Sequence, residues 1–252
     1  MGQVLVTGAR RGIGKAIALA LAKANYDVAV ADIEQSAELQ AVAGEIAALG
    51  MKTVALRADI SDITTHAKLL DDAEAALGPL TTLVNNAGVT VMSRGDLLDV
   101  TAESYDRCMD VNARGTFFLT QSFARRVREN MTECHRSIIT ITSANATAVS
   151  IARGEYCMSK SAASMMSKLF AGRLSDEDIG VYEIQPGFIE TDMTAPSKAK
   201  YDAMIEAGLT VIKRFGTPDE VARIALTLAS GLLPYTSGQP IYADGGLLTV
   251  RY

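Results

Sequence analysis

Hydrophobic positions along the chain follow two alternating patterns. Short apolar runs bounded by polar residues or glycine predict strands that are buried on both faces. Longer segments with apolar residues three or four positions apart predict amphipathic helices. The strands are expected at 4–6, 28–31, 53–57, 82–84, 137–142, 181–184 and 240–243, and the helices at 13–25, 36–49, 66–76, 104–128, 155–173 and 219–229. This alternation indicates right-handed βαβ units, so we expect an α/β fold with a doubly wound parallel sheet in a three-layer α/β/α sandwich.

The chain shows no linker, internal repeat or low-complexity tract that would divide it. With 252 residues, of which 48% are hydrophobic, it is long enough to bury one large core, so we expect a single domain over 1–252. The longest irregular stretch lies at 187–215 and holds a short helical pattern at 201–207. Connections of this length often close over active sites, so residues from about 188 to 215 are predicted to form a substrate lid.

Composition argues against several classes of function. The formal net charge is −5 and no basic block interleaved with aromatics occurs, so nucleic-acid binding is not expected. No apolar span is long enough for a membrane helix and no signal sequence is evident, so neither membrane insertion nor secretion is expected. Cys108, Cys134 and Cys157 are odd in number and widely spaced, which favours a reducing cytoplasm. His66 and His135 lack neighbours at ligand spacing, so no metal site is expected.

The turn after the first strand carries three glycines in the spacing G-x-x-x-G-x-G. Gly8 would permit a tight turn, Gly12 would let backbone N–H groups approach a phosphate, and Gly14 would allow the helix to pack closely on the strand. Because the positive end of the following helix points at this turn, a diphosphate can bind there, and the turn predicts a dinucleotide site. Further candidate contacts in the same turn are Arg10, Arg11 and Ile13.

The residue that ends the second strand, Asp32, bears on the choice of cofactor. A carboxylate here can accept hydrogen bonds from the adenosine ribose and would repel a 2′-phosphate, which favours NAD. Arg10 and Arg11 act in the opposite sense, since a guanidinium could pair with that phosphate, so NADP stays open. We weigh Asp32 more heavily, because an unpaired carboxylate facing a phosphate is hard to tolerate. After the third strand, Asp59 and the backbone of Ile60 are candidates for adenine contacts, although Asp59 could also be a helix cap.

Tyr156 and Lys160 open a predicted helix four residues apart, so their side chains lie on one helix face. A free tyrosine has a pKa of about 10, and a nearby ammonium group would stabilise the phenolate and lower that pKa. Such a phenol can give and take the proton in chemistry between carbonyl and alcohol groups. Tyr156 is the only tyrosine of the chain with a lysine at this spacing.

The motifs occur in a set order along the chain. The glycine turn is followed by Asn85-Asn86-Ala87-Gly88, a strand ending in Ser143, the Tyr156/Lys160 pair, Pro186-Gly187 and Asp244-Gly245-Gly246. In this order they resemble the short-chain dehydrogenase/reductase family in its single-domain form, over essentially the whole chain, and come closest to 3-oxoacyl-ACP reductase-like members. The resemblance implies a Rossmann fold and an NAD(P)-dependent oxidoreductase of a carbonyl or secondary alcohol. It also implies a homotetramer, with the helices at 104–128 and 155–173 and the last strand at the interfaces.

The resemblance also implies roles for individual residues. Tyr156 would be the acid/base, Lys160 would lower its pKa and bind the nicotinamide ribose, and Ser143 would hold the substrate oxygen. Asn112 would anchor a proton-relay water to the lysine. Three other hydroxyls compete chemically with Ser143 but lack the family's spacing: Thr140, Thr142 and Thr147. The remaining implied cofactor contacts are Asn86, Ala87 and Gly88 at the ribose, and Pro186, Gly187, Ile189 and Thr191 at the carboxamide.

The loop before Tyr156 flanks the substrate in this family, and here it is polar. Candidate substrate contacts are Arg94, Asn145, Arg153 and Glu155. They favour a hydroxylated or anionic small molecule, although ordinary surface charge would look the same. Two features count against an acyl-carrier substrate. Asp32 argues against NADPH, and the acidic run at 175–178 would repel an acidic carrier protein.

Three hypotheses remain at this point. The first is an NAD(H)-linked dehydrogenase of a polar secondary alcohol or sugar-like polyol. The alternative is a 3-oxoacyl-ACP or acyl thioester reductase. The third, a cofactor-sensing or scaffold protein without turnover, is disfavoured because both Tyr156 and Lys160 are present.

Overall fold

One seven-stranded sheet forms the centre of the protein, whose computed structural model describes residues 2–130 and 132–250. In sheet order the strands are β3 (Thr53–Arg57), β2 (Asp27–Asp32), β1 (Gln3–Thr7), β4 (Thr82–Asn85), β5 (Arg136–Ile141), β6 (Ile179–Pro186) and β7 (Pro240–Ala243). Every neighbouring pair is parallel. The strand order reverses between β1 and β4, and such a switch point opens a crevice at the carboxyl ends of the strands.

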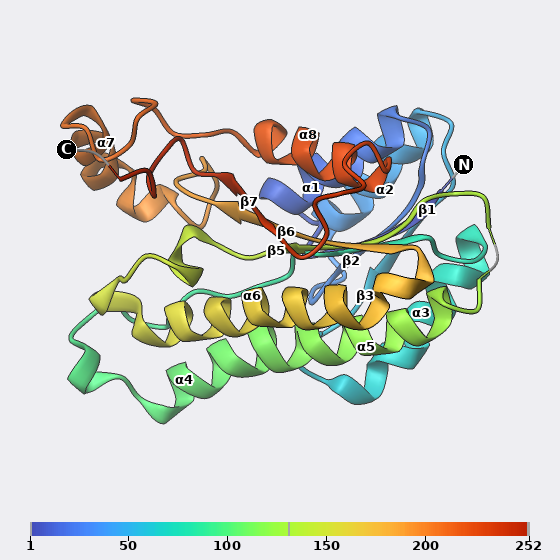
Figure 1. Ribbon diagram of the computed structural model, residues 1–252, viewed down its shortest axis with the longest axis horizontal. Helices are drawn as coiled ribbons and strands as arrows, with labels where there is room; N and C mark the ends of the chain where they lie inside the picture. Colours follow the sequence, from blue (N-terminus) through green and yellow to red (C-terminus); the bar gives the residue numbers. More distant parts are fainter. Residues whose placement is uncertain (1, 131, 251–252) are drawn as a thin grey trace.

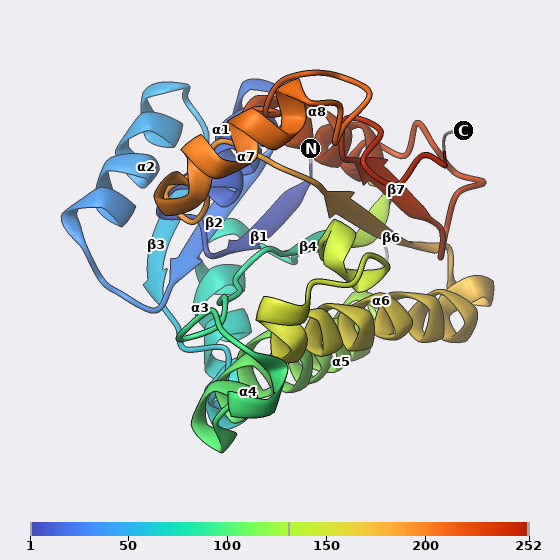
Figure 2. The ribbon, with the colours of Figure 1, turned by 90° about the vertical axis from the view of Figure 1, so that its left-hand side faces the viewer.

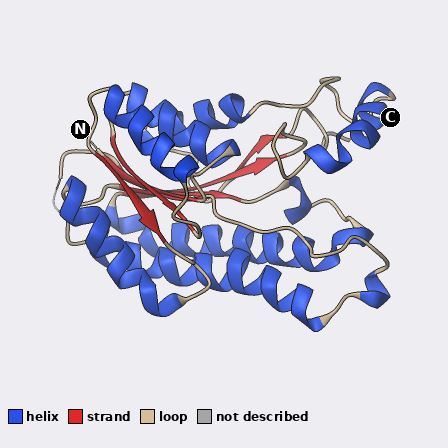
Figure 3. Cartoon of the chain, turned by 180° about the vertical axis from the view of Figure 1, so that it is seen from behind, coloured by secondary structure: helices blue, strands red, loops and turns tan. Residues whose placement is uncertain are grey.

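Helices cover both faces of the sheet, and Figures 1 and 3 show the three layers. One layer holds α1 (Gly12–Lys23), α2 (Ala37–Ala48) and α8 (Pro218–Ala229); the other holds α3 (His66–Leu77), α4 (Ala102–Met109), α5 (Thr116–Val127) and α6 (Gly154–Leu174). A further helix, α7 (Lys198–Glu206), lies at the end of the molecule where the strands finish (Figures 1 and 2). The predicted doubly wound parallel sheet and three-layer sandwich are therefore confirmed.

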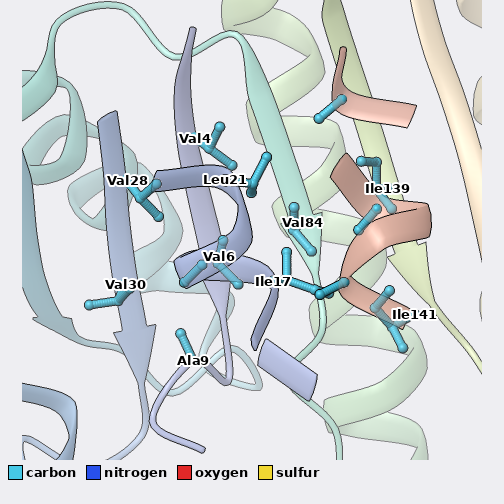
Figure 4. Packing of buried hydrophobic residues seen from close by; sticks show 14 of the residues in the cluster. Val4, Val6, Ala9, Ile17, Leu21, Val28, Val30, Val84, Ile139 and Ile141 are labelled. Atoms are coloured by element: carbon cyan, nitrogen blue, oxygen red, sulfur yellow. The ribbon is translucent and has the colours of Figure 1, made fainter. Parts of the chain in front are cut away.

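Alternate residues of each strand contribute to two separate cores, because successive side chains in a strand point to opposite faces. Val4 and Val6 of β1 pack with Ile17 and Leu21 of α1, as Figure 4 shows. Leu5, between them, packs on the other face in a cluster that includes residues of α3 and α5. Burial on both faces explains why the strands are continuous apolar runs in the sequence.

Two stretches differ from the predicted elements. The helix expected at 104–128 is a continuous helical path, but it consists of α4, a π-helical turn at Asp110–Gly115 and α5. The wide turn runs close to the loop after β3, since a Cβ on Gly115 would lie 2.2 Å from the Ile60 carbonyl oxygen. The short helix expected at 201–207 begins earlier, at Lys198, as α7.

The described residues include no candidate for a membrane span or for a metal site. No helix among them has both the length and the apolar character that a membrane span requires. In the same part of the chain, no group of His, Cys, Asp and Glu side chains is arranged to hold a metal ion.

Candidate active site

A cavity of about 640 Å³ lies at the carboxyl ends of the strands. Its lining comes from the ends of β1, β2, β5 and β6, from the loop after β4, and from α7. Every cofactor, catalytic and substrate candidate named from the sequence lines this cavity, apart from Gly14, Asn112 and Glu155. Segments far apart in the sequence thus meet around a single space.

The glycine turn forms one end of the cavity. Gly8 and Gly12 have positive φ angles of 63° and 56°, a region that residues with a Cβ seldom adopt. A Cβ on Gly14 would lie 2.2 Å from the Gly8 carbonyl oxygen, so glycine at this position lets α1 begin directly against the turn. Asn86 ties the turn to β4, because its Nδ2 donates to the carbonyl oxygens of Thr7 and Gly8 at 2.9 Å each.

The N-terminus of α1 is suited to an anion. Arg11 occupies its N-cap position without a side-chain capping hydrogen bond, and the first turn contains no acidic residue. By contrast, Ser36 and Thr217 cap α2 and α8 with their side-chain oxygens. The backbone N–H groups in the first turn of α1 therefore fit the diphosphate of a dinucleotide, which would bring negative charge to the positive end of the helix.

Asp32, at the end of β2, stands in an acidic environment. The Arg10 guanidinium lies 3.6 Å from the Asp32 carboxylate, 2.7 Å from Glu34 and 3.4 Å from Glu38. One positive charge therefore faces three negative ones, and only 16% of the Arg10 side chain is exposed. Carboxylates therefore outnumber guanidinium groups in this cluster at the end of β2.

Two other cofactor candidates have local partners. Arg11 pairs with Asp192 at 3.1 Å, and this exposed pair joins the glycine turn to the segment after β6. The Asp59 carboxylate accepts hydrogen bonds from the backbone N–H and the hydroxyl of Ser61, at 2.9 and 2.7 Å. Asp59 thus orders its own loop and also lines the cavity, whereas Asp62 caps the following helical turn, so the capping alternative for Asp59 is wrong.

Tyr156, Lys160 and Ser143 come together beyond the glycine turn. Tyr156 and Lys160 lie on one side of α6, with the Lys160 Nζ atom 5.9 Å from the centroid of the Tyr156 ring. Lys160 also donates to the Ile141 carbonyl oxygen at the end of β5, at 3.1 Å. Ser143 follows that strand end, accepts a hydrogen bond from the Asn145 N–H at 3.1 Å, and lies near enough to the Tyr156 phenol to act on its pKa. The three side chains therefore converge from α6 and the end of β5.

Burial dominates the electrostatics of this centre. It raises the pKa of Tyr156 above its ordinary value, while the nearby Ser143 hydroxyl and the positive charge of Arg153 act in the opposite direction. Burial also lowers the pKa of Lys160 to about 8, against the opposing effects of Glu183 and Cys108. The net lowering of the Tyr156 pKa that the sequence suggested is not found among the protein groups, because desolvation of the phenolate outweighs the nearby charges.

Asn112 lies behind the cavity, in the π turn between α4 and α5. Its amide accepts from the Val89 N–H at 2.8 Å and donates to the Val89 carbonyl oxygen and the Ser159 hydroxyl, both at 2.9 Å. A Cβ on Gly88 would lie 3.1 Å from the Asn112 Oδ1 atom and 3.3 Å from the Lys160 Nζ atom. The side chains of Asn112 and Lys160 therefore both lie next to Gly88, and the π-helical turn places Asn112 in this position.

Arg153 lies beside the reacting phenol. It is half-buried, and its guanidinium carbon is 5.5 Å from the centroid of the Tyr156 ring. It donates to the Asn145 side-chain oxygen at 2.7 Å. Arg153 and Asn145 therefore form one polar unit next to Tyr156.

Two more arginines line the same end of the cavity. Arg94 is exposed and donates to the Tyr201 hydroxyl of α7 at 3.0 Å. Arg107 of α4, which sequence reasoning did not single out, donates to the Thr90 carbonyl oxygen at 2.9 Å. Within residues 2–130 and 132–250, neither these two arginines nor Arg153 forms an ion pair with a carboxylate.

Glu155 does not face the cavity, and its assignment as a substrate contact is wrong. Its side chain is 3% exposed and accepts a hydrogen bond from the Ser104 hydroxyl of α4 at 2.6 Å. The sequence analysis placed Glu155 at the start of the predicted helix at 155–173 and also grouped it with the loop before Tyr156, and α6 begins at Gly154. Neighbouring helical residues point about 100° apart, so the turn that directs Tyr156 into the cavity directs Glu155 toward α4.

Sequence reasoning also gave no role to Glu183, in the middle of β6. This carboxylate is fully buried and accepts hydrogen bonds from Thr142, Ser164 and Gln185. The signal was an acidic residue inside an apolar strand, which is rare unless the charge has partners. For Arg107 the sequence offered no comparable signal, because an exposed helical arginine is ordinary.

The comparisons with known proteins agree with this geometry. Residues 8–248 match a family model described as enoyl-(acyl carrier protein) reductase. A short-chain dehydrogenase/reductase of Aspergillus aculeatus is 34% identical over 258 residues, covering 97% of this chain and 95% of that protein.

Solved structures give the same result. A 3-oxoacyl-[acyl-carrier protein] reductase from Brucella melitensis in complex with NAD is 40% identical, with a TM-score of 0.96, and covers 100% of this chain and 98% of that one. A protein from Agrobacterium tumefaciens with bound NADP, assigned as a 2-deoxy-D-gluconate 3-dehydrogenase, is 30% identical, with a TM-score of 0.86 and coverage of 99% and 97%. The chain therefore belongs to the short-chain dehydrogenase/reductase family of NAD(P)-dependent hydride-transfer oxidoreductases.

Proposed function

We propose that the protein is an NAD(H)-preferring dehydrogenase of a polar, hydroxylated and anionic small molecule. The observation that carries the proposal is the distribution of charge along one cavity. Carboxylates gather at the end where the adenosine ribose would lie, and arginines without carboxylate partners among the described residues line the other end. Tyr156 lies beside Arg153, one of these arginines.

The side chains at the centre have distinct proposed roles. When bound, the nicotinamide supplies the hydride acceptor or donor. Tyr156 is the acid/base: it gives its proton to the carbonyl oxygen in reduction and takes the hydroxyl proton in oxidation. The Ser143 hydroxyl holds that oxygen, and the Lys160 ammonium stabilises the phenolate and faces the nicotinamide ribose. Asn112 holds the proton path to Lys160 through its hydrogen bond with Ser159 and its position at Gly88.

The preference for NAD rests on Asp32 and its surroundings. Relatives with NAD and with NADP are both known, so the family does not decide between them. In this chain Arg10 is already compensated by Asp32, Glu34 and Glu38, which leaves it little capacity to bind a 2′-phosphate. Titration with NADH and NADPH, followed by nicotinamide fluorescence, should show tighter binding of NADH. Equal or tighter binding of NADPH would overturn this part of the proposal.

The substrate class rests on Arg94, Arg107 and Arg153. Three guanidinium groups around one cavity suit a carboxylate, and hydroxyl groups on the same molecule suit the Asn145 amide. D-Gluconate and D-glucitol are a matched test pair, because they differ only by a carboxylate in place of a hydroxymethyl group. With NAD⁺, gluconate should have the higher kcat/KM. Equal kcat/KM values for the two compounds would be consistent with a dehydrogenase but would contradict an anionic substrate.

A second candidate function, reduction of a 3-oxoacyl-ACP or other acyl thioester, has its own observation. Leu98, Val149 and Ile151 are 90%, 88% and 66% exposed in the loops near the cavity, where an acyl chain could lie. Against a carrier protein, Glu177 pairs with both Arg128 and Arg173, so these cations are already compensated. Faster reduction of a 3-oxoacyl thioester than of any hydroxy-acid partner would favour this alternative.

The segment 188–215 is proposed as the substrate lid of a single domain that spans 1–252. Its two ends are joined where Gly216 bonds to Phe188 and Glu190, at 2.8 and 2.9 Å, so the segment can move as one unit about this base. Arg11 with Asp192 and Arg94 with Tyr201 connect the segment to the cavity rim. Faster proteolysis of this segment without NADH than with it would support a lid, and equal rates would contradict it.

We also propose a homotetramer in the cytoplasm. Met158, Met165 and Leu169 are each more than half exposed, and their spacing places them along one face of α6. Such a face suits contact with a second copy of the chain, and light scattering should give the mass of four chains. Cys108 and Cys157 are free thiols, in keeping with a reducing compartment.

A further inference from the structure

Glu183 is a buried acidic residue to which the proposed reaction assigns no role. It is 0% exposed and lies in β6, between Tyr182 and Ile184, which point into the apolar core on the opposite face. Its own face of the strand packs against α6, the helix that carries Tyr156 and Lys160. A carboxylate seldom occupies such a place unless partners compensate its lost hydration, so this residue requires an explanation.

The partners of Glu183 are all hydrogen-bond donors. Its Oε1 atom accepts from the Thr142 hydroxyl at 2.6 Å and from the Gln185 amide at 2.8 Å, and its Oε2 atom accepts from the Ser164 hydroxyl at 2.9 Å. An ionised carboxylate only accepts hydrogen bonds, and three donors are aimed at this one. Thr142, Ser164 and Gln185 therefore hold both oxygens of the Glu183 side chain in fixed positions.

Two of these partners lie next to residues of the reaction centre. Ser164 lies one helical turn after Lys160 on the same side of α6, and Lys160 itself is bonded to the end of β5. Thr142 directly precedes Ser143 in the chain, and its backbone N–H donates to the Ile184 carbonyl oxygen at 2.9 Å. Glu183 thus holds both the strand end that carries Ser143 and the helix segment that carries Lys160.

The charges around Lys160 come from three elements. Tyr156 lies on its own helix, Cys108 faces it from α4, and Glu183 faces it from β6. Burial lowers the pKa of Lys160 to about 8, and Glu183 has the larger of the two opposing effects, ahead of Cys108. Glu183 is the one carboxylate among these groups, and its hydrogen bond to Ser164 holds it against α6 one helical turn from Lys160.

We propose that Glu183 is a positioning residue of the reaction centre: it is the buried counter-charge that keeps Lys160 an ammonium ion, and through Thr142 it fixes the strand end that carries Ser143. This inference rests on the proposed role of Lys160. An ammonium group donates hydrogen bonds to the ribose and stabilises the phenolate, whereas a neutral amine does neither as well. Without Glu183, a lysine in this environment would lose its proton at a lower pH.

The test measures Lys160 directly and needs no substrate. The rate of acetylation of Lys160 by acetic anhydride is followed against pH by mass spectrometry, since only the neutral amine reacts. The parent protein should show a midpoint near pH 8, and Glu183→Gln should move it down by about one pH unit, the usual effect of losing a nearby opposite charge. If the proposed function holds as well, the alkaline limb of kcat/KM for carbonyl reduction should move in the same direction.

The matched control is Ser164→Ala, which removes one hydrogen bond from Glu183 and keeps its charge. The pH midpoint of Lys160 acetylation in this variant should equal that of the parent protein. An unchanged midpoint in Glu183→Gln, or an equal shift in Ser164→Ala, would overturn the proposal. Should Glu183→Gln not fold, Glu183→Met gives the same measurement with a side chain of similar volume. Failure of both to fold, while Ser164→Ala folds, would make Glu183 a purely structural residue and would also overturn it.

Discussion

The two ends of the cavity are built from different materials. At the cofactor end the site is formed chiefly by the backbone. Gly8 and Gly12 have positive φ angles, and Gly14 lies close to the turn. At the substrate end the lining consists of side chains on exposed or half-buried segments, chiefly Arg94 and Arg153. The first end can change little without disturbing the packing of α1 on the sheet, whereas the second can change its chemistry while the fold remains.

This contrast has a consequence for specificity. A backbone-built site binds a group that is common to many partners, such as a diphosphate, because N–H groups are present whatever the side chains are. A site built from side chains can select one substrate among many, because each substitution changes its charge and shape. Substitutions at the two ends should therefore differ in kind: loss of folding and cofactor binding at one, and altered KM at the other.

The largest effect is expected where the two ends meet, at Tyr156. Tyr156→Phe removes the hydroxyl that transfers the proton and keeps the ring, so turnover should fall by about a thousandfold, within the range for general acid/base groups. Binding of NADH should remain, since the phenylalanine ring fills the same space. Steady-state rates, combined with a fluorescence titration of NADH, measure both quantities. Full turnover in this variant would remove the acid/base role.

The fold could be predicted because its signals are local and repeated. Val4, Leu5 and Val6 form a continuous apolar run, and the structure buries them on alternate faces of one strand. The π turn at Asp110–Gly115 could not be predicted in the same way. A turn with one additional residue leaves the apolar pattern on either side almost unchanged, and the close approach of Gly115 to the Ile60 carbonyl depends on a loop far away in the sequence.

The next effect tests how rigid the cofactor end is. In Gly14→Ala the new Cβ would lie 2.2 Å from the Gly8 carbonyl oxygen, so backbone must move. We expect the free energy of unfolding to fall by about 2–3 kcal/mol, as for other overpacked sites, and NADH binding to weaken. Thermal or urea unfolding and a fluorescence titration measure these changes.

Gly44→Ala is the matched control, because a Cβ on this residue of α2 meets nothing within 4 Å. There alanine should raise the free energy of unfolding by about 0.5–1 kcal/mol through its better helix propensity. Equal destabilisation by both substitutions would mean that Gly14 has no special place in the turn.

A smaller effect is expected for the choice of cofactor. Asp32→Asn keeps the shape of the side chain and removes the charge that disfavours a 2′-phosphate. The ratio of the Kd values for NADPH and NADH should fall by about 30-fold, equivalent to about 2 kcal/mol for a hydrogen bond to a charged group. Glu38→Gln, whose side chain is 66% exposed where that of Asp32 is 11% exposed, should change the ratio less. If Asp32→Asn leaves this ratio of Kd values unchanged, residues other than Asp32 determine the choice between NADH and NADPH.

The candidate site was predictable to different degrees at its two ends. The glycine turn and the Tyr156/Lys160 pair are local spacings, and the structure places all of them as expected except in the net direction of the Tyr156 pKa. Glu155 was misplaced because it was grouped with the polar loop before Tyr156, although the predicted helix already began at 155, and its contact with Ser104 of α4 cannot be read from the sequence. Arg107 and Glu183 were missed because their meaning comes from neighbours on other elements, which a single sequence does not bring together.

The smallest effect should show how independent the substrate end is. Arg153→Gln keeps a donor for Asn145 but removes the positive charge beside Tyr156. The KM for gluconate should rise by about tenfold, or about 1.4 kcal/mol, while the KM for glucitol and the Tm stay unchanged. The charge of Arg153 lowers the pKa of Tyr156, so its removal raises that pKa, and alcohol oxidation, which needs the phenolate, should require a higher pH. A shift in the pH dependence without a change in KM would mean that Arg153 acts only on the Tyr156 phenol. The substrate carboxylate would then be bound by Arg94 and Arg107.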